Sequence, residues 1–498
     1  MIIGIVNPTK AYIQANSDEI GSLEKQLTYK NTSKQFEYTK HLKKRWLQQK
    51  DPDAWQIEKD NLFSQITQCL LKKDSVGYWI RPGIIPYIKD LSLTISNYIE
   101  YPKFKPLKWF NMPEFEPYIY QSDSVDLLLE NKHAHISLPT GCGKSFIAEL
   151  LVQKSGLDVV IVTPGESIFN ELLDNFTRSF GKSLVGGYGD GKKDINKKIT
   201  IAIGKSLTNL IEGTDAYNFF AAKQMMIIDE SHTFAASTLE DVAHGVLSDI
   251  PYRFFVSATQ TRGDGTEKLL NSIIGKCVLE MSIEDAIDQG YLCPLQFTIL
   301  DTFSPSTSSP PDPIENKREH FLYNTEIAKL AAQIANAKWE FKQESTLILV
   351  EELVQIQMLE KLIKVPCAYV HSASKKEAAK FGLVPVDSKE QVARFNRGEV
   401  NVLIGTKAIA TGTNIYPTHN TINFIGGNSE IITKQGCMGR STRKLEISKF
   451  SKLHKPKPFA MIYDFNVTNN TKLEKQLDSR KGWYKESGGE IHHFKLMV

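Results

Sequence analysis

One short segment, LPTGCGKS at residues 138–145, constrains the fold more than any other part of this chain. It follows the apolar run HIS at 135–137 and precedes FIAELLV at 146–152, whose apolar residues recur with helical spacing. Strand, glycine-bearing loop and helix start, in that order, form the setting that a phosphate-binding loop requires. A plain glycine turn before a structural helix is the alternative, but GKS in this setting is a restrictive combination. The segment therefore predicts an α/β domain that binds a nucleoside triphosphate.

The residues of this loop have distinct expected roles. Its glycines let backbone N–H groups converge on phosphate oxygens at the positive end of a helix dipole. Lys144 would neutralise the β- and γ-phosphates, and the Ser145 hydroxyl would bind Mg²⁺. The expected cofactors are therefore ATP and Mg²⁺. The nucleotide-binding residues predicted in the loop are Pro139, Thr140, Gly141, Cys142, Gly143, Lys144 and Ser145.

Two acidic residues follow a later apolar run that predicts a buried strand. The run QMMII at 224–228 leads directly into Asp229 and Glu230, which places both carboxylates at the C-terminal end of a parallel strand, where α/β sheets bind ligands. Asp229 is expected to hold the Mg²⁺ ion, and Glu230 to orient or deprotonate the attacking water. A helix N-cap followed by a first-turn acid is the structural alternative.

Length and composition indicate the number of domains and exclude some classes of protein. A chain of 498 residues is too long for one core and predicts about three domains. The net charge of +3 means that contact with a polyanion must come from local patches. No apolar run is long enough to cross a bilayer and the start lacks a signal-peptide pattern, so we expect no membrane contact and a cytoplasmic location. The six cysteines show no zinc spacing.

The domain holding the loop is predicted to span 106–288. Further buried strands are expected at 158–164, 199–203 and 253–256. The last of these ends in the small residues SAT at 257–259. Upstream of the loop, Gln121 precedes a helix, and its carboxamide has the geometry to pair with the edge of adenine.

A second domain is predicted at 289–470, followed by a C-terminal tail at 471–498. Helical and apolar runs alternate through it, which predicts a second parallel sheet. The loop GTKAIATGTNI at 405–415 is rich in hydrogen-bond donors. In QGCMGRSTR at 435–443, Arg440 and Arg443 lie three residues apart, so in a helix they would project from one face. They are candidate arginine fingers, although an isolated RxxR usually faces solvent.

Residues 1–105 carry no nucleotide motif and are predicted to form a small α/β accessory domain that binds DNA. Its basic cluster combines Lys40, Lys43, Lys44 and Arg45 with Trp46. Such a cluster has the chemistry to grip a phosphate backbone and stack on a base. A solvated helix face is the ordinary explanation of a charge run, so both interpretations stay open.

Taken in order, these segments resemble the motifs of the superfamily-two helicases. The resemblance covers about 115–445: Gln121 resembles the Q motif, LPTGCGKS motif I, TPGESIFNEL motif Ia, DESH motif II, SAT motif III, GTKAIATGTNI motif V and QGCMGRSTR motif VI. DESH, Arg262 after SAT and the GYLCP turn at 290–294 look most like the phage branch-migration helicases of the UvsW type and the RecG-like fork remodellers. The resemblance implies an α/β fold with two tandem RecA-like domains, each with a parallel sheet, beside the accessory domain.

The family also implies roles for individual residues. Asn414 departs from the family, which commonly has Asp there, and this puts a ribose contact in doubt. Candidate contacts with a nucleic-acid strand are Thr163, Lys205, Ser257, Thr406 and Thr413. Gly412 is expected to contact the nucleotide, and His232, Thr259 and Gln435 to couple the nucleotide site to the strand.

The function expected from the resemblance is an ATP-dependent DNA helicase or translocase that remodels forks and Holliday junctions, with branch migration, in replication, recombination or repair. Its partners would be branched or single-stranded DNA, with replication or recombination proteins as further candidates, and the protein would act as a monomer. If it is phage-encoded, it would act in the cytoplasm of the host cell. The sequence leaves open an RNA helicase, a motor subunit of a restriction system, and a binding protein with a vestigial ATPase.

Overall fold

The computed structural model describes residues 1–498 apart from 114–115, 235, 259–264, 407–413, 431 and 496–498. It forms two compact units. The first comprises Met1–Leu138 with Gly143–Glu280, and the second comprises Pro139–Cys142 with Met281–Val498. Across the described residues, no helix combines the length and the apolar character needed to cross a bilayer.

The first unit begins with an accessory domain built on a small mixed sheet. Its strand order is β5-β6-β2-β1-β7, with β1 and β7 parallel and the other neighbours antiparallel. Ile3, Ala11 and Leu23 are among the residues of its apolar core. The elements are β1 (Ile2–Asn7), β2 (Lys10–Gln14), α1 (Ser17–Leu27), β5 (Lys72–Lys73), β6 (Tyr78–Ile80), the 3₁₀ helix η1 (Pro82–Tyr87) and β7 (Thr94–Asn97).

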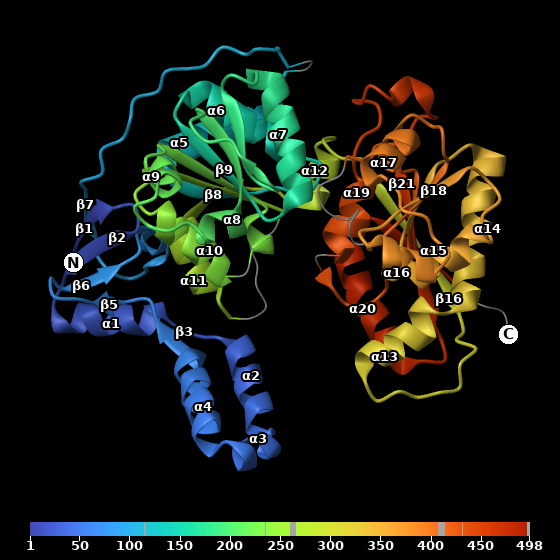
Figure 1. The fold of residues 1–498 in the computed structure, drawn as a ribbon, viewed down its shortest axis with the longest axis horizontal. Coiled ribbons are helices and arrows are strands. Elements are labelled where there is room, and N and C mark those ends of the chain that lie inside the picture. The colour runs from blue at the N-terminus through green and yellow to red at the C-terminus, as the bar shows by residue number, and fades with distance from the viewer. Residues whose placement is uncertain (114–115, 235, 259–264, 407–413, 431, 496–498) are drawn as a thin grey trace. The chain divides into compact units, whose positions relative to one another are not determined.

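A helical arm, residues 31–66, is inserted into this accessory domain. It stands on a two-stranded ribbon and projects from the accessory sheet in Figure 1. The ribbon consists of β3 (Thr28–Lys30) and β4 (Thr67–Cys69), and the arm consists of α2 (Thr32–Leu42), α3 (Arg45–Lys50) and α4 (Pro52–Ile66).

The rest of the first unit is an α/β domain with helices on both faces of its sheet (Figure 1). The strand order is β11-β10-β12-β9-β13-β14-β8-β15, and every described neighbouring pair except β10–β11 is parallel. β-Branched runs such as VVIVT form strands that are buried on both faces. The strands are β8 (His133–Ser137), β9 (Val159–Thr163), β10 (Val185–Gly189), β11 (Lys192–Lys193), β12 (Ile199–Ile203), β13 (Met225–Asp229), β14 (Tyr252–Ser257) and β15 (Lys276–Glu280).

A glycine with a left-handed backbone conformation ends helix α6 of this domain. Helix α6 ends at Gly156, which adopts φ 60° and lies so near the carbonyl of Lys105 that a Cβ would meet it at 1.8 Å. The helices are α5 (Ile119–Asn131), α6 (Lys144–Ser155), α7 (Glu166–Phe180), α8 (Gly204–Thr208), α9 (Asp215–Ala221), the 3₁₀ helix η2 (Ser231–Thr233), α10 (Ala236–Asp241), the π-helix η3 (Val242–Val246) and α11 (Glu267–Ile274).

The second unit has a sheet whose described neighbouring strands are all parallel, in the order β18-β19-β17-β20-β21-β16-β22. Alternate residues of β17 enter two different apolar clusters, since Leu347 and Leu349 join one and Ile348 the other. The sheet is therefore covered on both faces. The strands are β16 (Leu295–Thr302), β17 (Thr346–Leu349), β18 (Cys367–Val370), β19 (Val402–Gly405), β20 (Asn420–Asn423), β21 (Ala460–Val467) and β22 (Glu490–Phe494).

The residues predicted as a C-terminal tail belong to the fold of this unit. α20 contributes Leu477 and Tyr484 to an apolar core, and β22 pairs with β16. The helices of the unit are α12 (Ile283–Asp288), α13 (Pro313–Lys317), the π-helix η4 (Arg318–Leu322), α14 (Thr325–Lys342), α15 (Leu353–Glu360), α16 (Lys375–Lys380), α17 (Ser388–Asn396), the π-helix η5 (Ile432–Met438), α19 (Gly439–Ser441), the 3₁₀ helix η6 (Ser451–Leu453) and α20 (Thr471–Lys485). The α/β fold with parallel sheets is confirmed, while the boundaries at 105, 288 and 470 stay predictions.

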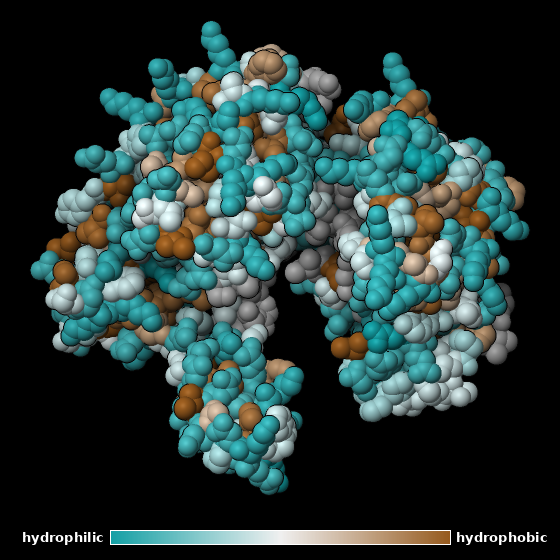
Figure 2. Space-filling view, in the orientation of Figure 1, coloured by the Kyte–Doolittle hydropathy of each residue, from teal (hydrophilic) through white to brown (hydrophobic). Residues whose placement is uncertain are grey.

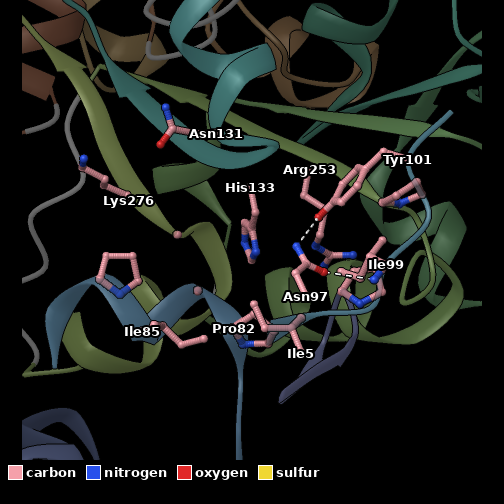
Figure 3. Close-up of a pocket in the computed structure, with 15 residues that line it drawn as sticks. Ile5, Pro82, Ile85, Asn97, Ile99, Tyr101, Asn131, His133, Arg253 and Lys276 are labelled. Carbon is pink, nitrogen blue, oxygen red and sulfur yellow. Dashed lines mark hydrogen bonds between the residues drawn. The ribbon is translucent and has the colours of Figure 1, made fainter. Parts of the chain in front are cut away.

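A cavity of 190 Å³ lies between the accessory domain and the α/β domain of the first unit (Figure 3). His133 opens β8 and Lys276 opens β15, so the cavity lies at the amino edge of the sheet, away from the phosphate loop. Asn97 donates to the hydroxyl of Tyr101 at 3.2 Å along its wall. Ligands of α/β sheets bind at the opposite edge, so we interpret this cavity as a packing gap between two domains.

Candidate functional site

The phosphate loop connects the carboxyl end of β8 to the first residue of α6. Gly141 and Gly143 have φ values of 99° and 70°, a region that residues with a Cβ rarely adopt. A Cβ placed on Gly143 would lie 2.5 Å from the Nε2 atom of Gln121. The loop is therefore wound tightly and leaves no space for a side chain at this position, as a backbone cradle for phosphates requires.

Gln121 lies against this loop, as the Q-motif resemblance requires. It is the N3 residue of α5, and its Oε1 accepts from the backbone N–H of Tyr118 at 3.0 Å. Its side chain is 5% exposed. The structure thus brings Gln121 together with the loop, and the contact with adenine stays a prediction.

Burial raises the pKa of Glu149, on the helix that follows the loop, to about 7. The Ser179 hydroxyl donates to its Oε2 at 2.8 Å, which opposes the shift without cancelling it. Between an unfolded pKa near 4.5 and about 7, the unfolded state releases this proton while the folded state keeps it. Stability is therefore lost as the pH rises through this window.

Glu149→Gln should remove that loss because the glutamine carbonyl still accepts from Ser179 and carries no charge. We expect the variant to gain about 2 kcal/mol over the wild type at about pH 8 and almost nothing at about pH 4.5. Thermal melts of both proteins across this pH range measure the difference. Parallel melting curves at all pH values would mean that Glu149 is not held neutral.

The two acids occupy the end of β13 as predicted. Asp229 closes the strand with its side chain buried, and Glu230 follows in the left-handed region at φ 48° and ψ 44°. Left-handed backbone at a non-glycine residue costs free energy, and such strain clusters at functional sites. Both acids therefore lie at the carboxyl edge of the sheet, with a sharp backbone turn at Glu230.

Lys144 joins the acids at this edge. Its Nζ lies 3.5 Å from Glu230 Oε1 and donates to the Leu138 carbonyl at 3.3 Å. Burial, followed by the charge of Glu230, raises the pKa of Asp229, whereas Lys144 lowers it. The structure therefore assembles the lysine and both acids beside the phosphate loop.

These residues fit an Mg²⁺–nucleotide complex. Asp229 supplies a carboxylate and Ser145 a hydroxyl, both hard oxygen ligands of the kind Mg²⁺ prefers. Mg²⁺ sites usually take only one or two protein ligands beside phosphate oxygens and water.

β14, which leads into SAT, is hydrogen-bonded directly to the start of the phosphate loop. β14 pairs in parallel with β8, and the N–H of Leu138 donates to the Ser257 carbonyl at 2.8 Å. A shift of either strand end is therefore passed to the other through a backbone bond.

The residues predicted to contact a nucleic-acid strand differ in their solvent exposure. Thr163 and Ser257 are both 0% exposed, and the Thr163 hydroxyl donates to backbone carbonyls of Gly165 and Ala202. Each of these two side chains lies inside the domain in this structure, and its assignment as a strand contact stays a prediction. Lys205 is exposed and Thr406 is 9% exposed, so these assignments stay predictions. Gly412, Thr413, Thr259 and the side chain of His232 lie outside the described residues.

In the second unit, the segment around Arg440 is helical only up to Ser441. Gln435 lies in the π-helix η5 and Arg440 in α19, whereas Arg443 follows the helix end. Arg440 and Arg443 therefore do not project from one helical face, because the helix ends between them. Arg440 is 2% exposed and Arg443 is partly exposed.

Two buried cations that the sequence did not single out hold this segment. Lys457 donates to the carbonyls of Ser441 and Arg443 at 2.6 and 2.8 Å, just where α19 ends. Burial lowers the pKa of Lys457 to about 8. A cation at a helix C-terminus satisfies carbonyls that have no helical partner. In the sequence Lys457 is one of several scattered lysines, and no local pattern separates it from the others.

The second cation is Arg480 on α20. It forms a two-bond ion pair with Asp464 of β21, at 2.7 and 2.9 Å, and donates to the Gly427 carbonyl. Tyr484 donates to the same carboxylate at 2.8 Å. The charges of Asp464 and Arg480 also act on the thiol of Cys437 in η5. This buried network holds α20 to β21 and to the Gly427 carbonyl, whereas the sequence predicts a polar tail with a helix around 472–483 here and gives no sign of the network.

Two family models match the chain in the order that the motifs predict. The model described as type III restriction enzyme, res subunit, matches residues 114–262, and the helicase conserved C-terminal domain matches residues 326–444. Together they cover more than half of the chain. The first contains Lys144 and both acids, and the second contains both arginines.

Individual known proteins are similar to this chain over segments of different lengths. The ATP-dependent DNA helicase uvsW of Enterobacteria phage T4 is 22% identical over 368 residues, which are 70% of this chain and 68% of that protein. The DNA 3'-5' translocase XPB2 of Sulfurisphaera tokodaii is 27% identical over 168 residues, which are 33% of this chain and only 36% of that protein.

Among solved structures, a fragment of a putative HsdR subunit of a type I restriction enzyme from Vibrio vulnificus YJ016 has a TM-score of 0.54 at 17% identity. It covers 77% of this chain and 69% of that one, and it supports the fold. With both family models matched in order and an assembled phosphate loop, lysine and acid pair, the chain belongs to the superfamily-two helicases.

Proposed function

We propose that this protein is an ATP-dependent DNA helicase or translocase that remodels branched DNA. One observation carries the ATPase part: Lys144, Asp229 and Glu230 converge beside a tightly wound phosphate loop. The DNA part is supported by the two curated relatives, whose names describe a DNA helicase and a DNA translocase. The preference for branched DNA rests on the resemblance of DESH, Arg262 and GYLCP to the branch-migration helicases.

Four side chains of the first domain have a defined role in this proposal. Lys144 holds the β- and γ-phosphates, which requires its Nζ to leave Glu230 Oε1 when nucleotide binds. That exchange frees the Glu230 carboxylate to orient the attacking water and accept its proton. Ser145 and Asp229 would hold Mg²⁺, which supplies positive charge to the phosphates when bound.

The second domain completes the site in the proposed cycle. Arg440 would reach the γ-phosphate in the transition state, where a guanidinium stabilises the spread negative charge. Lys457 and Arg480 hold the segment that carries it. Binding and hydrolysis of ATP would alternate the grip of the two domains on one strand, and each cycle would advance the protein. Action as a monomer stays a prediction.

The test compares nucleic acids as activators of ATP hydrolysis by the purified chain. A fork, a Holliday junction, a tailed duplex, single-stranded DNA and single-stranded RNA of equal length are supplied in turn. We expect DNA to raise turnover at least about tenfold and branched DNA to be unwound or branch-migrated, with strong dependence on salt. Strong stimulation by RNA alone would overturn the proposal.

The family model named after a restriction enzyme brings one alternative into the same test. A restriction motor would need a partner chain to recognise its site, whereas the proposed remodelling enzyme acts alone. Activity of the single chain on forks that lack any specific sequence supports the proposal. Activity that appears only after a partner subunit is added would favour the restriction motor.

A further inference from the structure

The arm, residues 31–66, has its own small core. His41 of α2 stacks on Trp55 of α4 with ring centroids 5.4 Å apart, and His41 Nε2 lies 3.0 Å from the Trp55 carbonyl. Asp51 caps α4 by accepting from the N–H of Ala54, and Pro52 occupies the first turn. The two long helices are thus fixed to each other near their joined ends, so the arm is a preformed element.

The tip of the arm is rich in basic residues. Between residues 38 and 50 there is no acidic residue. None of the basic side chains there forms an ion pair with a described residue, whereas Lys34, lower on the arm, pairs with Glu37. These tip residues are Lys40, Lys43, Lys44, Arg45 and Lys50, and each is exposed or partly exposed. Five positive charges without counter-ions attract a polyanion locally, although the whole chain carries only +3.

Trp46 stands within this cluster with 63% of its surface exposed. It lies on α3, the short helix between the two long ones. Figure 2 shows the arm as largely hydrophilic, with isolated hydrophobic residues on the face in view. An exposed indole among cations has the chemistry to stack on a base while its neighbours hold phosphates.

The base of the arm is bonded to the ATPase domain. Lys268 of α11 donates to the carbonyls of Gln26 and Thr28 at 2.6 and 2.8 Å, immediately before and within the ribbon. Arg81, which directly precedes η1 in the accessory domain, pairs with Glu240 of α10, the helix that follows DESH. The base of the arm is therefore bonded to α11, which follows motif III, and the accessory domain that carries the arm is paired with α10, which follows motif II.

We infer that the arm recognises the branch point of the DNA. Trp46 stacks on the base pair where the strands part, and Lys43, Lys44 and Arg45 hold the flanking phosphates. Helix α3 has six residues and is on the order of 9 Å long, which suits one step of a junction better than a long single-stranded track. This inference rests on the proposed function and adds the element that selects branched DNA.

The experiment uses the full chain with two arm variants and one matched control. One variant carries Lys43→Glu, Lys44→Glu and Arg45→Glu, and the other carries Trp46→Ala, with Trp46→Phe as its conservative counterpart. The control carries Lys25→Glu, Lys72→Glu and Lys89→Glu, three exposed lysines of the accessory domain outside the arm. All substituted lysines are surface residues, and thermal melts check that the variants fold.

Affinity for a four-way junction and ATPase stimulation by linear single-stranded DNA are measured for each protein. We expect the triple arm variant to lose at least about tenfold in junction affinity, with the salt slope reduced by about 3. Trp46→Ala should lose several-fold and Trp46→Phe should keep most of the affinity. Stimulation by linear DNA should stay within about twofold of the wild type, because the ATPase site is intact.

Three results would overturn the inference: an unchanged junction affinity, an equal loss on linear DNA and junctions, or an equal loss in the control variant. Failure of the proposed function is distinct, since no DNA would then stimulate the wild type. Stimulation of the wild type by forks, retained in the arm variants, removes only the role of the arm.

Discussion

Replacing Glu230 with glutamine is expected to lower the ATP turnover number by roughly 10²- to 10⁴-fold while leaving ATP binding nearly intact. Glutamine has the size of glutamate but cannot accept the proton of the attacking water. The substitution leaves Asp229, the predicted Mg²⁺ ligand, in place and removes a nearby negative charge that raises the pKa of Asp229. Loss of the Lys144–Glu230 ion pair should slightly strengthen nucleotide binding, because Lys144 no longer has to leave a carboxylate.

The measurement pairs steady-state ATPase assays in the presence of DNA with equilibrium binding of a fluorescent ATP analogue. Glu212→Gln, an exposed acid in the same domain, is the control and should behave as the wild type. Turnover by Glu230→Gln within a few-fold of the wild type would show that another group activates the water. Equal loss of binding and turnover would instead indicate a damaged phosphate loop.

Much of this site was predictable from sequence because its parts are local. A phosphate loop needs its glycines, lysine and hydroxyl within eight residues, and the acids must follow a buried strand directly. Parallel sheets then bring these two strand ends to one edge, whatever the chain does elsewhere. The positions of Lys144, Asp229 and Glu230 follow from this rule alone.

The strand contacts and the anchoring residues were not predictable in this way. Thr163 and Ser257 have residue types suited to a phosphate contact, but whether a strand-end side chain points in or out depends on the register of its neighbours. Lys457 and Arg480 act only through partners 14 to 53 residues away in sequence. Such pairs exist only after the sheet has formed, so no window of sequence contains the signal.

The arm illustrates a second limit. The basic run at 40–45 is visible in the sequence, yet a solvated helix face was the ordinary explanation. Its proposed function depends on three facts that only the fold supplies: His41 and Trp55 hold the helices together, the basic side chains of the tip form no ion pair with a described residue, and Lys268 bonds the base. A charge run becomes a candidate site when a rigid support presents it.

Arg440→Ala is expected to reduce DNA-stimulated ATP turnover by roughly 10³-fold, with nucleotide affinity changed by less than about tenfold. An arginine finger interacts with charge that develops in the transition state, so its loss lowers turnover much more than binding. Arg440→Lys should keep little of the wild-type ATP turnover, since an ammonium lacks the planar guanidinium fork. Because Arg440 is almost fully buried, thermal melts must accompany the kinetics.

The matched control for this variant is Arg397→Ala, an exposed arginine of the same domain that pairs with Glu390 and Glu399. It should keep wild-type turnover, since surface ion pairs contribute little. A folded Arg440→Ala protein with turnover close to the wild type would remove Arg440 from the catalytic step. In that case Arg443, which follows the helix end and is partly exposed, becomes the remaining candidate for the finger, and Arg443→Ala should then show the loss that Arg440→Ala did not.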